Sequence, residues 1–408
     1  MAASAAFAPA VRADDSSDSI WDILARNARK KQVDPDKNTA AALATIDTPE
    51  PILSFDTANN IQNAIAYYTQ VVQQGGWQPP SRQTYNLQNG KDGRVVTDLK
   101  RHLMLVGDMP AAQHPNDHFD DDTDLAVRRF QVRHGIIPNG KIDEPTFYAL
   151  QVSAEERLNQ LQLNLLRVQA VAGNLTADRY VVVNIPAASI EAVEGGQVAQ
   201  RHTAVVGRID RPTPILDSKI QQVNFNPYWH VPKSLIEKDL IQYMNDDPDY
   251  LTKFNIHIYD AKGNEVMPTD IDWHTDDAVN YSFRQDPGAE NSLGHCRINF
   301  PNKFDVYLHD TPSKSLFAEN ARFHSSGCVR VEGVDELVTW LLGPNGGWDQ
   351  EAVDAVFNSN ERLDVNLKSP TPIHTTYVSA WANRNGIVSF RDDVYKFDAQ
   401  GLVDTTTA

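Results

Sequence analysis

Cys328 is the residue whose type and neighbours most readily support chemistry, because short polar residues surround it. A cysteine is nucleophilic only as the thiolate, so a catalytic cysteine needs a nearby base or cation. His309, His324 and Arg330 are the candidates close to it in the sequence. By residue type alone, Cys328 is either a catalytic nucleophile or a small buried core residue, since free cysteine is usually buried.

Gly327 and Ser326 directly precede the cysteine and are predicted to shape the loop around it. A glycine lets the backbone come close to a substrate carbonyl. Consecutive backbone amides in such a loop could donate hydrogen bonds to the oxyanion of a tetrahedral intermediate. The segment therefore favours attack of a thiolate on a carbonyl carbon.

The second cysteine, Cys296, has no predicted role, and two cysteines are too few for a disulfide framework. A zinc site made from His295, Cys296, His324 and Cys328 is conceivable by ligand type. The sequence disfavours such a site, because neither pair has the close spacing that preorganises zinc. We predict no metal and no cofactor.

The composition bounds the class of protein. A chain of 408 residues is expected to form two or three domains, and its 41% hydrophobic and 22% charged residues suit a globular fold. The net charge of -17 argues against nucleic acid as a partner and against charge-driven docking on anionic lipid. No stretch approaches the roughly 20 apolar residues that a membrane-spanning helix requires.

Residues 1–48 are predicted to lie outside the folded domains. The first residues are small and apolar and end in Val-Arg-Ala, as before a signal-peptidase site. This favours the remnant of an export signal over a plain alanine-rich terminus, and the polar residues that follow suit a disordered linker. We therefore expect an exported protein of the periplasm or cell envelope.

Helical patterns dominate the next part of the chain. Within residues 49–94, the segment Asn59–Gln74 has helical spacing of apolar residues and stops at two glycines. Residues 95–152 predict a small module of short helices around a shared core. Its helices are expected over Val95–Leu105, Thr123–His134 and Glu144–Leu150.

From Tyr180 onward, short β-branched runs separated by Gly, Pro and Asn turns predict strands. Residues 158–408 are therefore expected to form a mixed, β-rich domain. Residues 238–292 interrupt the strand rhythm and are either a lid or insertion over a cleft or a plain surface excursion. The predicted fold class is α+β multidomain, with a β-rich domain and a small three-helix module.

The segment Ser-Ser-Gly-Cys-Val-Arg-Val, preceded by Tyr-Leu-His-Asp-Thr-Pro, resembles the active-site signature of the L,D-transpeptidase (YkuD-type) catalytic domain. The likeness is greatest to a large periplasmic branch of that family, and it covers roughly residues 55 to 395. Residues 119–150 resemble a peptidoglycan-binding module. Further matching segments are Val205–Pro214, Asn226–Pro232, Arg284–Asn302 and Tyr377–Trp381.

The resemblance implies that Cys328 is the nucleophile and His309 the base, with His324 as the rival base. The cysteine of this family attacks the peptide bond before the terminal D-Ala of a tetrapeptide stem and releases D-Ala. The amine of a second stem then resolves the thioester, which gives a 3-3 crosslink in peptidoglycan. Acylation of the same cysteine by carbapenems is a further expectation.

The resemblance also implies a substrate-binding group around the cysteine. Arg330 either holds a stem-peptide carboxylate or braces the loop, and Ser326 and Gly327 shape the oxyanion loop. The remaining positions are either substrate contacts or core residues, since aromatic residues on strands are often core. They are Tyr307, Asn302 and Trp229.

Two alternative functions stay open at this stage. In an L,D-carboxypeptidase, water rather than an amine would resolve the thioester. A non-catalytic wall-binding protein would keep the scaffold and the helical module without turnover. The expected partners are donor and acceptor stem peptides of peptidoglycan. The sequence does not indicate whether the protein is a monomer or an oligomer.

Overall fold

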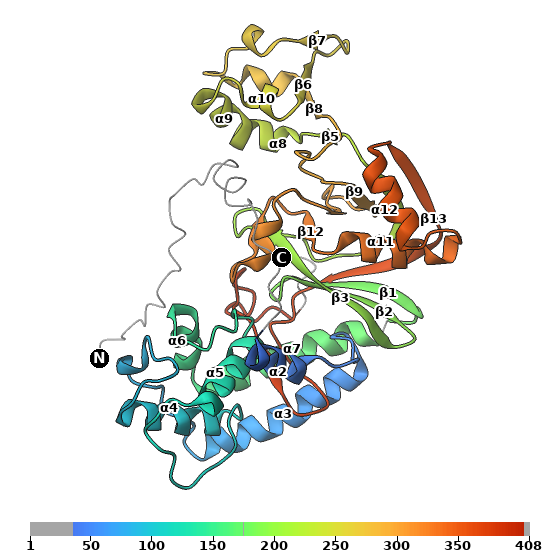
Figure 1. Ribbon diagram of the computed structural model, residues 1–408. Helices are drawn as coiled ribbons and strands as arrows, with labels where there is room; N and C mark the ends of the chain where they lie inside the picture. Colours follow the sequence, from blue (N-terminus) through green and yellow to red (C-terminus); the bar gives the residue numbers. More distant parts are fainter. Residues whose placement is uncertain (1–35, 174, 404–408) are drawn as a thin grey trace.

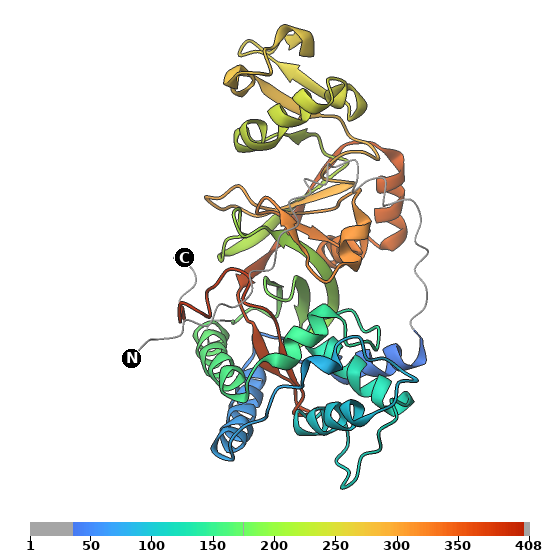
Figure 2. The ribbon, with the colours of Figure 1, turned by 90° about the vertical axis from the view of Figure 1, so that its left-hand side faces the viewer.

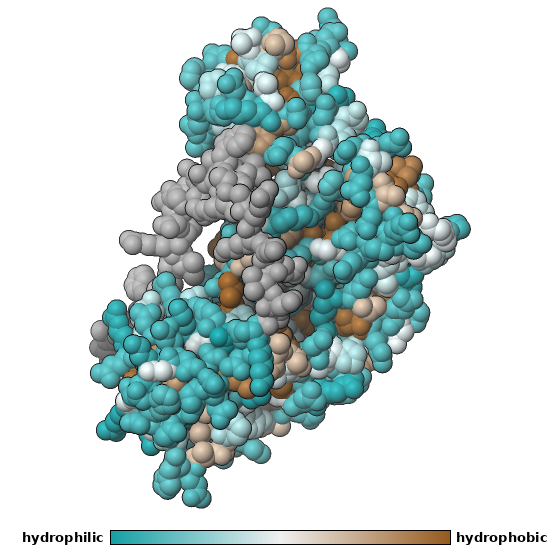
Figure 3. Space-filling view, viewed as in Figure 1, coloured by the Kyte–Doolittle hydropathy of each residue, from teal (hydrophilic) through white to brown (hydrophobic). Residues whose placement is uncertain are grey.

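The computed structural model describes residues 36–173 and 175–403, which form three regions (Figure 1). Helices make up the N-terminal region, a large sheet with two covering helices lies in the middle, and a small domain projects from the far side of the sheet. The visible surface is mainly hydrophilic (Figure 3). In the described residues, no helix is both long and apolar enough to cross a membrane.

Capping side chains and apolar spacing explain the N-terminal helices. Ser54 caps α3 through its side chain, and Ser153 and Glu156 form a capping box at the start of α7. The helices predicted from periodicity are confirmed, with ends that differ by a few residues. The complete set of helices in the described N-terminal region is α2 (Lys37–Ile46), α3 (Phe55–Gln73), η1 (Arg82–Thr84), α4 (Arg94–Leu105), α5 (Asp121–Arg133), α6 (Glu144–Gln151) and α7 (Ala154–Ala172), of which α2 and η1 were not predicted.

Helix α2 lies inside the range 1–48, for which the sequence predicted only an export remnant and disordered linker. That prediction was wrong for residues 37–46, and residues 1–35 lie outside the described part of the chain. Asp36 caps the helix through the Thr39 amide. Arg128 on α5 contacts both residues, so tertiary contacts stabilise a short alanine-rich segment with weak intrinsic patterning.

The central sheet has nine strands in the order β11-β3-β12-β10-β9-β4-β13-β1-β2. Strand β3 pairs with β2 through its first part and with β12 through its last, so the sheet closes on itself. Its strands are β1 (Arg179–Asn184), β2 (Ser189–Glu194), β3 (Gln197–Gly207), β4 (Asp217–Phe225), β9 (Cys296–Asn299), β10 (Leu308–His309), β11 (Phe323–Ser325), β12 (Val329–Val331) and β13 (Leu363–Thr376).

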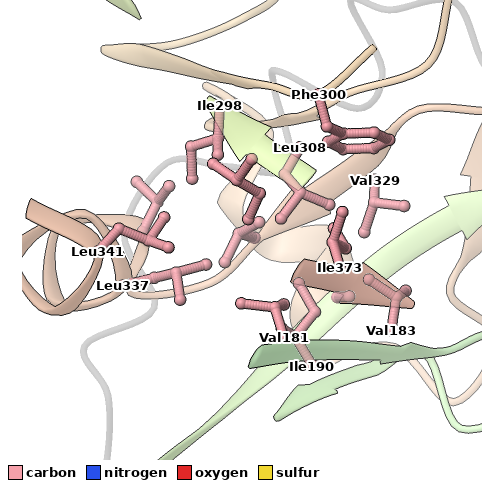
Figure 4. Packing of buried hydrophobic residues seen from close by; sticks show 14 of the residues in the cluster. Val181, Val183, Ile190, Ile298, Phe300, Leu308, Val329, Leu337, Leu341 and Ile373 are labelled. Carbon is pink, nitrogen blue, oxygen red and sulfur yellow. The ribbon is translucent and has the colours of Figure 1, made fainter. Parts of the chain in front are cut away.

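One face of this sheet buries an apolar core against α11 (Val334–Leu342) and α12 (Gln350–Ser359). Figure 4 shows Ile298, Leu308 and Val329, from three neighbouring strands, in the same apolar cluster as Leu337 of α11. Because strand side chains alternate between faces, the residues next to these three along each strand lie on the other face. That other face carries the polar residues discussed below.

The outer side of β1 and β2 is covered by the N-terminal helices, which lie below the sheet in Figures 1 and 2. Tyr180, Val182 and Val193 share a buried cluster with Ile61 of α3 and Leu161 of α7. The same cluster takes in the two-stranded sheet of β14 (Ala380–Ala382) and β15 (Val388–Phe390). The helices are therefore part of one packed body with the sheet.

The predicted three-helix module has its own core, in which Leu99, Leu103, Phe130, Ile142 and Leu150 are buried together. It also contacts the rest of the chain, through an arginine that an ion pair holds in place within the module. Arg133 makes a buried ion pair with Asp108 and donates to the Val388 carbonyl of β15. The module is thereby fixed against the sheet-bearing region.

Residues 229–285 form a small domain, here called the insert domain, with its own four-stranded sheet and apolar core. It begins at Trp229, earlier than the segment 238–292 that interrupts the strand pattern in the sequence. Its strands are β5 (Trp229–His230), β6 (Ile256–Tyr259), β7 (Glu265–Val266) and β8 (Ser282–Gln285). Its helices are α8 (Lys233–Leu235), the π-helix η2 (Ile236–Leu240), α9 (Ile241–Asp246), α10 (Tyr250–Lys253), η3 (Pro268–Asp270) and η4 (Asp276–Asn280); η5 (Lys314–Ala318) and η6 (Gly343–Asn345) lie outside it.

Candidate active site

The polar face of the central sheet carries His309 between two arginines. In strand register, His309 of β10 lies opposite Arg297 of β9 on one side and Arg330 of β12 on the other. Directly paired residues point to the same face of a sheet. These three side chains therefore form one row across neighbouring strands.

Cys328 comes directly before β12 and lies beside Tyr307, because Leu308 pairs with Val329 in the parallel ladder. The Val329 amide donates to the Tyr307 carbonyl at 3.0 Å, which fixes this alignment. Alternation then places Cys328 on the same face as Arg330, and Tyr307 on the same face as His309. The predicted base on β10 and the predicted nucleophile directly before β12 thus lie on the same face of the sheet.

Burial raises the pKa of the Cys328 thiol, because a thiolate loses solvation there. Hydrogen bonds from the Tyr307 backbone and hydroxyl, and the charges of Arg330 and Arg297, act in the opposite direction. The resting thiol is therefore protonated at neutral pH. It has to pass its proton to a base when it reacts.

His309 is buried and held in one tautomer. Its Nδ1 donates to the Asp310 carbonyl at 2.5 Å, so Nε2 is the nitrogen with a free lone pair. Burial, and then the charge of Arg330, lower the pKa of His309 to about 3. The imidazole is neutral at pH 7 and can accept a proton at Nε2.

Asp310 braces the turn that follows His309. Its carboxylate accepts from the His295 amide at 2.9 Å and pairs with Lys314. Gly294 packs so closely against this carboxylate that a Cβ at that position would overlap it, and its φ of +55° also favours glycine. The strand end that carries His309 is therefore rigidly supported.

The loop before Cys328 is held by its own backbone groups. Gly327 adopts φ +115°, its amide donates to Ser325 Oγ at 3.2 Å, and its carbonyl accepts from Thr213 Oγ1 at 2.9 Å. Ser325 Oγ in turn donates to the Cys328 carbonyl at 2.5 Å. The amides of Ser326 and Cys328 have no acceptor among the described residues, and the Cys328 amide, which belongs to the predicted nucleophile itself, is free to bind an oxyanion.

Ser326 connects the loop to the insert domain. Its exposed Oγ accepts from Arg211 Nη1 at 3.0 Å, and Arg211 also makes a two-oxygen ion pair with Asp239 of η2. A π-helix at this contact is a local irregularity of a type often found at functional sites. The insert domain therefore contacts the loop that carries the predicted nucleophile.

The remaining predicted site residues lie in different settings. The Trp229 side chain hydrogen-bonds the Tyr307 side chain, which places the first strand of the insert domain at the site. Asn302 uses its amide within its own loop, donating to the Val306 carbonyl and accepting from the Val306 amide. His324 is exposed and binds Glu319 at 2.9 Å through Nε2.

The second cysteine lies on the opposite face of β9 from Arg297, fully buried in the apolar core. Burial raises its pKa well above the ordinary value. In the part of the chain that the structure describes, no three His, Cys, Asp or Glu side chains gather in a way that could hold a metal ion.

Residues 178–377, which contain this whole arrangement, match the family model of the L,D-transpeptidase (YkuD) catalytic domain. This part of the chain is therefore similar to the L,D-transpeptidase family. Residues 92–150 match a peptidoglycan-binding domain, in agreement with the helical module. The resemblance seen in the sequence is confirmed for both regions.

The chain is also similar to a curated protein of Haemophilus influenzae, whose name provisionally assigns it to the L,D-transpeptidases. The two are 37% identical over 221 residues, which are 54% of this chain and 45% of that protein. This chain thus spans less than half of the relative's length.

Solved L,D-transpeptidases were also matched. The chain from Stackebrandtia nassauensis is 14% identical, with 76% of this chain and 100% of that chain covered and a TM-score of 0.26. The chain from Xylanimonas cellulosilytica is 15% identical, with 73% and 100% covered and a TM-score of 0.24.

Several residues at this site were missed by sequence reasoning. Arg297, Arg211 and Asp239 lie on segments distant from Cys328 in the chain, and charged residues in such segments look like ordinary surface positions. Arg211 and Thr213 lie within Val205–Pro214, and Arg297 lies within Arg284–Asn302. Both segments resemble the family, yet none of these three residues was assigned a role. The two segments were the available signal.

Proposed function

We propose that this chain is a cysteine-dependent L,D-transpeptidase that forms 3-3 crosslinks in peptidoglycan. The observation that carries the proposal is the pairing of β10 with β12, which puts His309 and Cys328 on one polar face inside the matched catalytic domain. Its donor would be a tetrapeptide stem and its acceptor the side-chain amine of a second stem. An envelope location follows from this substrate.

In the first step, Cys328 Sγ attacks the carbonyl carbon before the terminal D-Ala while its proton passes to His309 Nε2. The Asp310 carbonyl holds Nδ1–H and so keeps Nε2 directed to this task. The Tyr307 hydroxyl donates to the sulfur and stabilises the thiolate as it forms. A neutral thiol and a neutral imidazole at rest suit a proton transfer that accompanies attack.

The carbonyl oxygen becomes an oxyanion when the carbon–sulfur bond forms. The free Cys328 amide is a donor that this loop offers to it. When the intermediate collapses, the carbon–nitrogen bond breaks and the D-Ala amine takes the proton from His309. A thioester on Cys328 and free D-Ala remain.

The acceptor amine then attacks the thioester and gives its proton to His309, and the thiol is regenerated when the carbon–sulfur bond breaks. Water in place of the amine would give the L,D-carboxypeptidase reaction. The matched peptidoglycan-binding domain at residues 92–150 would keep the polymer near the site. Mass analysis of products from a tetrapeptide donor with and without an acceptor stem separates the two reactions.

The nucleophile is tested by intact-protein mass after incubation with a carbapenem. A carbapenem is an acylating agent, so the expected result is a covalent adduct on the native protein that is absent from Cys328→Ala. Cys296→Ala is the matched control, because it removes the other thiol, which is buried in the core. It should keep the adduct.

An adduct on Cys328→Ala would overturn the assignment of the nucleophile. No adduct on the folded native protein, together with no D-Ala release from stems, would favour a wall-binding protein without turnover. Melting temperatures of both variants establish that a lost adduct does not reflect unfolding.

A further inference from the structure

Arg297 and Arg330 differ from the other arginines near the site in having no hydrogen-bond or ion-pair partner among the described residues. Neither makes an ion pair or a hydrogen bond within the described residues, and the Nε atom of each is buried. By contrast, Arg211, Arg284 and Arg362 each pair with an aspartate. The chain has 54 acidic and 37 basic residues. Carboxylates are therefore abundant, yet none of them pairs with these two arginines in the described residues.

The two unpaired guanidiniums lie on either side of His309. Arg297 and Arg330 are its register partners on the two neighbouring strands, and the charge of each acts on the Cys328 sulfur. The Arg297 guanidinium lies over the Tyr307 ring at 5.0 Å, which fixes its position beside the thiol. A guanidinium held with little solvation and without a counter-ion is costly, so each of the two arginines favours an anion beside it.

A carboxylate is the anion that this arrangement fits. Arginine binds carboxylates through two parallel N–H donors, and such bonds are stronger when the groups are partly buried. The donors lie next to the nucleophile, so the bound group must belong to a residue at the scissile bond. Arg297 adds the second cation, which the sequence did not predict.

We propose that Arg297 and Arg330 together form a carboxylate subsite beside Cys328, and that this subsite selects stem peptides with a free carboxylate next to the scissile bond. The inference rests on the proposed function for its substrate. Two stem groups have this chemistry: the terminal carboxylate of D-Ala and the free carboxylate of the diamino acid. Arg297 is the specificity-determining residue in both cases.

The subsite is tested first without any transpeptidase activity, by comparing alkylation of Cys328 with iodoacetate and iodoacetamide. In both reactions the thiolate forms a carbon–sulfur bond and iodide leaves, but only iodoacetate carries a carboxylate. The ratio of the two rates cancels any change in the thiol pKa. Peptide mass mapping assigns the label to Cys328.

Arg297→Gln should lower the iodoacetate-to-iodoacetamide ratio by about tenfold or more, as expected for losing a charge-assisted hydrogen bond. Arg297→Lys should retain much of the ratio. Arg362→Gln is the matched control, since it removes the same charge from an arginine that already has a carboxylate partner at 3.1 Å. Its ratio should equal that of the native protein.

An unchanged ratio in a folded Arg297→Gln protein overturns the proposal. If that variant does not fold, the native protein still provides a test: acetate should slow the alkylation of Cys328 by iodoacetamide more than acetamide does. Equal protection by acetate and acetamide also overturns the proposal.

Stem peptides then identify the source of the carboxylate. One stem carries an amide at the terminal D-Ala, and another carries an amide on the diamino acid. If amidation of one carboxylate lowers kcat/KM in the native protein but not in Arg297→Gln, that carboxylate is the one that the two arginines bind. If the native protein and Arg297→Gln lose activity equally with both amidated stems, Arg297 does not determine specificity. If no stem reacts with the native protein, the proposed function is wrong. The alkylation ratio still tests the carboxylate subsite in that case.

Discussion

Arg211 holds both carboxylate oxygens of Asp239, at 2.6 and 2.9 Å, and the same guanidinium donates to Ser326 Oγ at 3.0 Å. Arg211 lies in the connection between β3 and β4, whereas Asp239 lies on the π-helix of the insert domain. The ion pair is partly shielded from solvent, with Arg211 and Asp239 side chains 12% and 25% exposed. It therefore ties the insert domain to the nucleophile loop more firmly than an exposed pair would.

Asp239→Asn should loosen the insert domain without unfolding the protein. Losing a partly buried charge pair is expected to cost about 1–2 kcal/mol, so backbone amides of η2 and α9 should exchange about tenfold faster in hydrogen–deuterium exchange. Carbapenem acylation of Cys328 should slow as well. Asp247→Asn is the control, because its Lys253 partner lies within the insert domain. It should leave acylation unchanged; equal slowing in both variants would contradict the role of the Arg211–Asp239 pair.

Tyr307→Phe should raise the pKa of the Cys328 thiol, because it removes a hydroxyl that hydrogen-bonds the sulfur and favours the thiolate. We expect the pH midpoint of iodoacetamide alkylation, already above the ordinary thiol range, to move up by about one unit. The alkylation rate measured from pH 7 to 10 provides the midpoint. Tyr148→Phe removes the hydroxyl of an exposed tyrosine on α6 and should not move it. An unmoved midpoint in Tyr307→Phe would argue against this hydrogen bond.

Gly327→Ala should impair acylation beyond its effect on stability. At φ +115° an alanine is strained, which costs about 1–2 kcal/mol and shifts the Cys328 amide that the oxyanion needs. The acylation rate is expected to fall by about a hundredfold. Gly90→Ala, at φ +83° with no atom near the added methyl group, should lose comparable stability and keep its acylation rate. Similar rates in the two variants would show that the Gly327 backbone has no part in catalysis.

Buried histidines should make the fold sensitive to acid. Burial lowers the pKa of His102 to about 4, below its unfolded value of about 6.5. The unfolded chain therefore binds this proton first as the pH falls, so stability is complete above pH 6.5 and declines between about 6.5 and 4. At pH 5 the loss should be about 2 kcal/mol.

The His102 contribution is measured by urea unfolding at pH 7.5 and pH 5. His102→Gln should show a smaller difference between the two pH values than the native protein, because the titrating group is gone. His114→Gln changes an exposed histidine and should show the native difference. A native-sized loss in His102→Gln would contradict the prediction.

The helices were largely predictable because their signals are local. Periodic apolar residues and capping side chains define α3, α4, α5 and α6 within a few residues of the observed ends. Helix α2 was missed because contacts with Arg128, not its own pattern, stabilise it. The sequence predicted an interruption of the strand pattern here but not a domain with its own sheet. The strands of the insert domain are short, and the turns and helices between them show no clear periodicity of apolar residues.

The sequence by itself determined the fold class, the helical module, the nucleophile and the base that we propose, since these rest on local patterns and on one motif around Cys328. Only the tertiary structure decided which residues surround that cysteine. Strand register places Arg297 beside His309, although the two residues belong to separate segments, and it leaves both flanking arginines without a carboxylate. Whether an arginine has a carboxylate partner depends on which distant segments lie beside it. The lack of a partner can therefore be recognised only when the positions of the neighbouring Asp and Glu side chains are known.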